Sequence, residues 1–238
     1  MEIRNLAVAV LGATGDMGRA IANMLARDGA RLAISGRDPK KLATLKTELE
    51  GVGAAVFADV VDVTEEVAVG RFFERAVDAL GPLAVLVYTP GLSVPGKIPE
   101  MDATDVRRML EVNVEGAFFA AKHFVGQVDP AAGGLAILLS SVAAKRANPN
   151  APIYCASKAA LAMMADGLAL QAAARNVRVT TLSPGAADTQ FWGNRSVPRE
   201  KFLRVDEVAE VVRFVLQMPS RVVFHDIVFE PFDFFKMK

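Results

Sequence analysis

The segment Gly12-Ala13-Thr14-Gly15-Asp16-Met17-Gly18 lies between an apolar run, residues 6–11, and a helical pattern formed by Ile21, Met24 and Leu25. This order predicts a strand, a tight turn and a helix. Glycines let the backbone turn sharply and approach a pyrophosphate, and the free amides at a helix N-terminus stabilise negative charge. Glycines also serve ordinary turns, but a position between strand and helix favours a nucleotide site.

Short apolar runs alternate with amphipathic stretches along the rest of the chain. The runs that we predict as further strands are residues 32–34, 54–57, 83–88, 135–139, 177–182 and 222–229. Continuous apolar runs are typical of strands buried on both faces, and alternation with helices implies right-handed crossovers. The fold class is therefore predicted as α/β, with a doubly wound parallel, Rossmann-like sheet. At 238 residues, one domain spanning 1–238 is the simplest organisation.

The overall composition favours chemistry on a small molecule. The chain has 27 basic and 27 acidic residues, so no net field attracts nucleic acid or an anionic membrane. A single cysteine, Cys155, cannot form an internal disulfide, which fits a cytoplasmic setting. The N-terminal apolar run is too short for a signal peptide or membrane span. We predict no metal site.

Tyr154 and Lys158 lie four residues apart in a helical pattern, which places them on one face. A cation beside a phenol lowers the pKa of the phenol, so the pair predicts a proton donor. An accidental helical pair is the alternative. Ser141 precedes Tyr154 by thirteen residues and follows the apolar run 135–139, which strengthens the functional interpretation.

Several motifs now stand in a characteristic order. They are Gly12-x-x-Gly15-x-x-Gly18, Asn113, Ser141, the Tyr154/Lys158 pair and Pro184-Gly185-x-x-x-Thr189. In this order and spacing the chain resembles the short-chain dehydrogenase/reductase family over nearly its whole length.

The resemblance implies roles for four candidate catalytic residues. Tyr154 would be the general acid or base, and Ser141 would hydrogen-bond the reacting oxygen. Lys158 would hold the nicotinamide ribose and depress the pKa of Tyr154. Asn113 would keep a water in a proton relay from Lys158 to solvent.

The resemblance also implies a cofactor site. Asp62, followed by Val63, would receive the adenine amino group, with Asp59 as a nearby competitor, and Thr189 would lie near the nicotinamide carboxamide. The complete predicted cofactor-binding set is Gly12, Thr14, Gly15, Asp16, Met17, Gly18, Arg37, Asp62, Val63, Thr89, Gly91, Tyr154, Lys158, Pro184, Gly185 and Thr189.

Cofactor choice depends on the end of the second predicted strand, Ile34-Ser35-Gly36-Arg37. A carboxylate there holds the ribose 2′-hydroxyl of NAD, whereas an arginine pairs with the 2′-phosphate of NADP. The acid is absent and Arg37 is present, so we predict a preference for NADP(H), with NAD(H) as the alternative. A solvated loop charge is the non-functional interpretation of Arg37.

Two segments depart from the main branch of the family, and a third has an unusual composition. Asp16 stands where the main branch of the family has its middle glycine, and Tyr88-Thr89-Pro90-Gly91 replaces Asn-Asn-Ala-Gly. Any contacts that the two asparagine side chains make in the main branch must therefore come from other residues in this chain. The segment after Thr189 is aromatic and basic, which suits either an anionic substrate or, as the better-supported alternative, a solvated basic face.

Two predicted helical stretches, 102–125 and 151–175, are apolar around most of their circumference. The sheet can cover one side, so we expect a partner subunit on the other, in a homodimer or homotetramer. Met164 is our candidate for the covered surface. Complete burial within one subunit is the alternative.

Together these observations predict a cytoplasmic oxidoreductase that transfers hydride between NADP(H) and a small carbonyl or alcohol substrate. The alternative is a sensor or scaffold protein that binds a dinucleotide without turnover. The complete set of Asn113, Ser141, Tyr154 and Lys158 favours catalysis, because a sensor needs no proton relay.

Overall fold

A seven-stranded parallel sheet forms the centre of the computed structural model, which describes residues 2–236. The strands are β1 (Ala7–Leu11), β2 (Arg31–Gly36), β3 (Val56–Val60), β4 (Val85–Tyr88), β5 (Gly134–Leu139), β6 (Val177–Pro184) and β7 (Asp226–Phe229). Their order is β3-β2-β1-β4-β5-β6-β7, so the chain winds outward first in one direction and then in the other. The predicted doubly wound α/β fold is confirmed.

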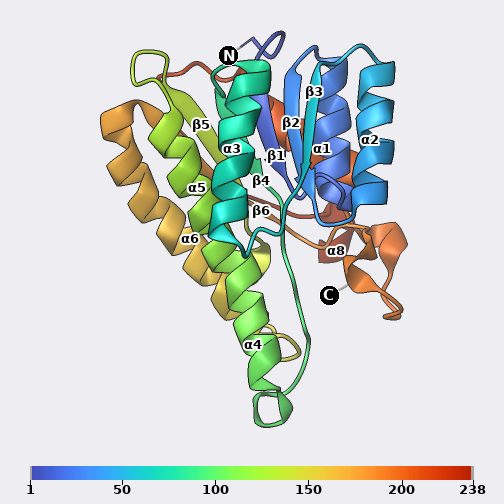
Figure 1. Ribbon diagram of the computed structural model, residues 1–238. Helices are drawn as coiled ribbons and strands as arrows, with labels where there is room; N and C mark the ends of the chain where they lie inside the picture. The colour runs from blue at the N-terminus through green and yellow to red at the C-terminus, as the bar shows by residue number, and fades with distance from the viewer. Residues whose placement is uncertain (1, 237–238) are drawn as a thin grey trace.

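Helices cover both faces of the sheet (Figure 1). The main ones are α1 (Asp16–Arg27), α2 (Pro39–Gly51), α3 (Glu66–Leu80), α4 (Ala103–Leu110), α5 (Gly116–Gln127), α6 (Pro152–Ala172) and α7 (Val205–Gln217), with a short α8 (Phe232–Phe235) near the end. Alternate residues of each strand point to opposite faces. One core therefore joins Ala9 and Leu86 to α3, α5 and α6, and the other joins Val10 and Val87 to α1, α2 and α7.

Some predicted boundaries were wrong. The run 54–57 was predicted as a strand, but β3 is Val56–Val60, because residues 52–53 turn after α2 and residues 54–55 lead into the strand. The run 222–229 contributes only β7, Asp226–Phe229. Apolar composition alone does not separate a strand from the apolar loop that leads into it.

The predicted helical stretch 102–125 consists of α4 and α5 joined by a π-helical turn, Glu111–Glu115. The buried Tyr88 hydroxyl donates a hydrogen bond to the Val112 carbonyl at 2.6 Å. That carbonyl belongs to the turn, where the wider π spacing alters the normal helical ladder. The turn carries Asn113, so a residue of β4 helps to set the position of a candidate catalytic residue.

Helix α6 and the short turn after it, Pro152–Arg175, form one segment of the described chain that is long and apolar enough to cross a membrane by length and composition. Core helices of soluble proteins pass the same test. Leu161 and Ala165 of this helix are buried in the core beside the sheet. Helix α6 therefore packs one side against the core, while 28% of its 18-residue apolar stretch is buried within the single chain.

Candidate active site

The glycine-rich turn joins β1 to α1, and its backbone leaves no room for side chains at two positions. Gly12 has φ +76°, a left-handed conformation that favours glycine. A Cβ on Gly18 would lie 2.4 Å from the Gly12 carbonyl oxygen. The N-terminus of α1 has no side-chain cap, so its first amides are available to an anion. These features fit a dinucleotide pyrophosphate. Gly15 is the N-cap residue of α1 at the same place, and Met17 lies in the first turn of this helix.

Thr89 stands where the main branch of the family has an asparagine, and its hydrogen bonds connect two parts of the site. Its hydroxyl and its backbone N–H both bond the Leu11 carbonyl, at 2.8 Å and 3.1 Å. Cβ atoms on Gly12 or Gly18 would come within 2.8 Å of this hydroxyl oxygen. Thr89 therefore ties the end of β4 to the glycine-rich turn, and Gly91 continues the same loop toward Lys158.

Lys158 and Tyr154 lie on one face of α6, as predicted. Lys158 is buried and donates a hydrogen bond from Nζ to the Leu139 carbonyl at 2.9 Å, at the end of β5. Its Nζ lies 5.9 Å from the centroid of the Tyr154 ring. Ser141 follows β5, and its side chain is hydrogen-bonded to that of Tyr154. The structure thus brings the serine, tyrosine and lysine together.

The prediction that Lys158 lowers the pKa of Tyr154 is not supported in the free protein. Burial raises the pKa of Tyr154 to about 12, although the hydrogen bond with Ser141 opposes the shift. Burial also lowers the pKa of Lys158 to about 8. Desolvation disfavours the charged form of each group, and it is the largest cause of both shifts. At neutral pH Tyr154 therefore holds its proton, which suits a donor.

Asn113 is buried and engaged at both ends of its side chain. Its Oδ1 accepts from the Leu92 N–H at 2.8 Å, and its Nδ2 donates to the Leu92 carbonyl and to Ser157 Oγ, at 2.9 Å and 2.8 Å. Ser157 in turn donates to the Tyr154 carbonyl at 2.8 Å. Asn113 thus links the loop after β4 to α6. Sequence analysis missed Ser157, because a serine inside a helix carries no distinctive signal.

The residues predicted to hold the adenosine part of the cofactor lie at the ends of β2 and β3. Arg37 is exposed directly after β2, and Thr14 packs so closely on Gly36 that a Cβ there would lie 2.4 Å from the threonine hydroxyl oxygen. Partial burial opposes ionisation of Asp62, but hydrogen bonds from Thr64 and the charges of Arg37 and Arg108 outweigh it and lower the pKa.

The two candidate acids on this side have different surroundings. Asp59 pairs with Arg75 at 2.5 Å and is therefore occupied. Asp62, which the buried Val63 follows, lies close enough to Arg37 for the positive charge to lower the pKa of its carboxyl. This difference favours Asp62 over its competitor.

Pro184 ends β6, and the chain then passes through Gly185 and Thr189 into the segment 190–202. The segment folds over the site, since the Phe191 ring lies 5.6 Å from the Tyr154 ring. Two of its three basic residues have partners within the chain: Arg195 donates to the Phe191 and Trp192 carbonyls, and Arg199 pairs with Asp188 at 3.1 Å. These contacts favour a structural role for the charges over recognition of an anion.

Two ion pairs connect the loop after Ser141 to the two ends of β7, at its first residue and at the residue that follows its last one. Lys145 Nζ lies 2.8 Å from Asp226 Oδ2, and Arg146 pairs with Glu230. Asp226 also accepts a hydrogen bond from Ser183 at 2.7 Å. These contacts hold the loop that begins at Ser141 against the sheet. Sequence analysis missed them, because the partners lie about eighty residues apart.

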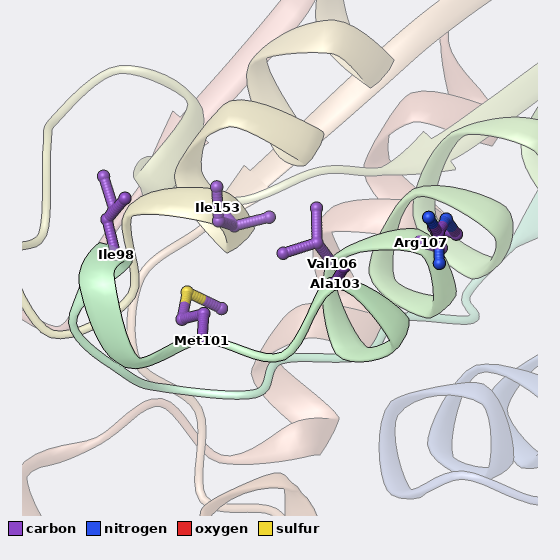
Figure 2. Close-up of a pocket in the computed structure, with 6 residues that line it drawn as sticks. All are labelled: Ile98, Met101, Ala103, Val106, Arg107 and Ile153. Carbon is purple, nitrogen blue, oxygen red and sulfur yellow. The ribbon is translucent and has the colours of Figure 1, made fainter.

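A pocket of about 370 Å³ adjoins the first turn of α6. Figure 2 shows Ile98, Met101, Val106 and Ile153 around it, with Arg107 farther along α4. Its lining is largely apolar, and Ile153 directly precedes Tyr154. Among residues 2–236, no group of three or more His, Cys, Asp or Glu side chains is placed to hold a metal ion.

Comparisons with known proteins agree with this geometry. The family model described as short chain dehydrogenase matches residues 6–199. An uncharacterised oxidoreductase of Staphylococcus saprophyticus is 29% identical over 97% of this chain and 99% of its own length. The chain belongs to the short-chain dehydrogenase family and is an oxidoreductase with a dinucleotide-binding fold.

Solved structures show the same likeness. An alcohol dehydrogenase from the archaeon Thermococcus sibiricus, complexed with 5-hydroxy-NADP, superposes with a TM-score of 0.89 at 30% identity, covering 96% of this chain and 97% of that one. A short-chain type dehydrogenase/reductase from Mycobacterium ulcerans also gives 0.89, at 25% identity, covering 96% and 89%.

Proposed function

We propose that this protein, as one domain spanning 1–238, is a cytoplasmic NADP(H)-dependent oxidoreductase that interconverts a small carbonyl compound and its alcohol. The juxtaposition of Ser141, Tyr154 and Lys158 at the carboxyl ends of the strands carries the proposal. The glycine-rich turn, Asp62 and Thr189 surround the same edge, where ligands bind in open α/β sheets. The Thermococcus sibiricus relative, crystallised with an NADP analogue, supports this cofactor class.

In this mechanism the bound nicotinamide supplies hydride. Tyr154 holds the proton that the substrate oxygen receives, and its raised pKa keeps that proton in place at neutral pH. Ser141 hydrogen-bonds the same oxygen and orients it. Lys158, charged below about pH 8, stabilises negative charge that develops beside Tyr154. Asn113 positions α6 through Ser157.

A substrate screen tests this function. The purified protein is mixed with small ketones, aldehydes and diols, each with NADPH, NADH or the oxidised form, and absorbance of the reduced nicotinamide is followed. Turnover with at least one compound is expected. Tight nucleotide binding, measured by calorimetry, without turnover of any compound would instead favour the sensor or scaffold function.

Cofactor preference should collapse in Arg37→Ala. Loss of a charge-assisted contact to the 2′-phosphate is expected to weaken NADPH binding about ten- to a hundredfold, while NADH binding stays nearly constant. Titration of both nucleotides measures the effect. Lys46→Ala removes an equal charge from the outer part of α2 and should change neither affinity. An equal loss for both nucleotides would assign Arg37 a structural role.

A side chain more exposed than Met164 is needed to test whether a second subunit covers helix α6. Met164 is partly buried against the core of its own subunit, so it probes a covered surface less directly than its more exposed neighbours do. The apolar side chains that the fold leaves open are its neighbour Met163, 71% exposed, with Leu170 at 82% and Phe118 at 48%. The side-by-side helices α5 and α6 carry all three (Figure 1). We propose that a second subunit covers this face.

Met163→Glu should therefore give a smaller species with nearly unchanged melting, because an unpaired carboxylate in an interface is strongly disfavoured. Met164→Glu, the matched change one residue along, should instead destabilise the subunit itself. Light scattering and thermal unfolding separate these results. A wild-type protein that is monomeric at micromolar concentration would contradict the proposed assembly.

A further inference from the structure

The segment that covers Tyr154 is fixed at its base by the sheet end. Asp188 N–H donates to the Leu203 carbonyl and Leu203 N–H donates to the Ala186 carbonyl, both at 2.8 Å. Between these bonds, residues 189–202 contain only short turns. The start of such a segment, where the chain leaves the base, needs another contact to hold one position over the site.

That contact comes from the glycine-rich turn. Asp16, the first residue of α1, accepts a hydrogen bond on Oδ2 from the Gln190 N–H at 2.5 Å. The two residues are 174 positions apart, and Phe191, which packs on Tyr154, directly follows the donor. Within the described chain, the bond connects the turn that would hold pyrophosphate to the segment over the proton donor.

We propose that Asp16 is a positioning residue, which holds the segment 189–202 over Tyr154 at the expense of dinucleotide affinity. The inference rests on the proposed function. A glycine at position 16 would leave the helix N-terminus wholly free for a pyrophosphate. The Asp16 carboxylate instead places a negative charge beside that site, while its hydrogen bond fixes the covering segment.

The chain carries its own reporter for this contact. Trp192 is the single tryptophan and lies two residues after Gln190. Its Nε1 donates to the Ala187 carbonyl at 2.8 Å, and its ring lies 5.0 Å from that of Phe202. Release of the segment would therefore change tryptophan emission and expose the Arg195 and Arg199 peptide bonds to trypsin.

Two substitutions at position 16 separate the hydrogen bond from the charge. Asp16→Ala removes both, so the free protein should show altered Trp192 emission and about tenfold faster tryptic cleavage after Arg195 or Arg199. Asp16→Asn keeps an acceptor oxygen, so emission and cleavage should stay near wild type. Both variants should bind NADP⁺ about two- to fivefold more tightly, because a like charge near the phosphates is gone.

A third substitution tests the donor. Gln190→Pro removes the N–H without touching Asp16, and proline suits the first position of a helical turn. It should reproduce the Asp16→Ala changes in emission and cleavage, and the double variant should add nothing further. If Asp16→Ala fails to fold, Gln190→Pro still tests whether this hydrogen bond holds the segment.

Glu48→Gln, an equal change of charge on α2, should alter none of these quantities. Unchanged emission and cleavage in both Asp16→Ala and Gln190→Pro would overturn the positioning role, as would failure of Asp16→Asn to restore them. Absence of NADP⁺ binding by the wild type would refute the proposed function instead. The emission and cleavage results would still test the contact.

Discussion

Tyr154→Phe is expected to lower kcat by about 10²- to 10⁴-fold while leaving the affinity for NADPH nearly unchanged. The variant loses the hydroxyl that holds the proton, but it keeps the ring, which packs 5.6 Å from Phe191. The hydrogen bond with Ser141 also disappears, so Ser141 alone is left to orient the reacting oxygen. Steady-state kinetics with a substrate found by screening, together with nucleotide titration, measures both quantities.

The chain offers a matched control, because it has only two tyrosines. Tyr88→Phe also removes one hydroxyl, which bonds the Val112 carbonyl in the core. Loss of that bond should cost roughly 1–3 kcal/mol of stability and, through the turn that carries Asn113, lower turnover far less than Tyr154→Phe does. Near-wild-type activity of Tyr154→Phe, or similar kinetic losses in both variants, would rule out the proposed proton transfer.

The fold could be predicted because the patterns that encode it are local. Apolar runs of strand length alternate with amphipathic stretches, and the turn from Gly12 to Gly18 marks the first crossover. Parallel strands end at one edge, so the positions of Ser141, Gly91 and Pro184 after predicted strands placed them together. Boundaries were less certain, as the actual extents of β3 and β7 show.

The details of the site depend on contacts between distant residues, which local patterns do not contain. The pKa values of Tyr154 and Lys158 reflect desolvation of a partly buried phenol and a buried ammonium, and spacing alone indicated only their proximity. The inward position of Met164 and the outward position of Met163 differ by one helical step. The contact of Asp16 with Gln190 likewise follows from the folded path of the chain.

Lys158→Met should abolish most turnover and yet raise the free energy of unfolding at pH 7. Burial lowers the pKa of this lysine from 10.5 to about 8, which corresponds to a cost of roughly 3 kcal/mol for holding the charge. Methionine fills similar space without charge. The lost hydrogen bond to the Leu139 carbonyl offsets about 1–2 kcal/mol, so a net gain of about 1–2 kcal/mol is expected.

The pH dependence of stability distinguishes this cause from better packing. A lysine whose pKa is lowered by folding destabilises the protein fully below about pH 8, and the penalty is relieved as pH rises toward 10.5. The advantage of Lys158→Met should therefore shrink by about 2 kcal/mol between pH 7 and 9.5 in urea unfolding. Lys46→Met, at an exposed site, should show no such trend. An advantage independent of pH would mean that the buried charge is not what limits the stability of the wild-type protein.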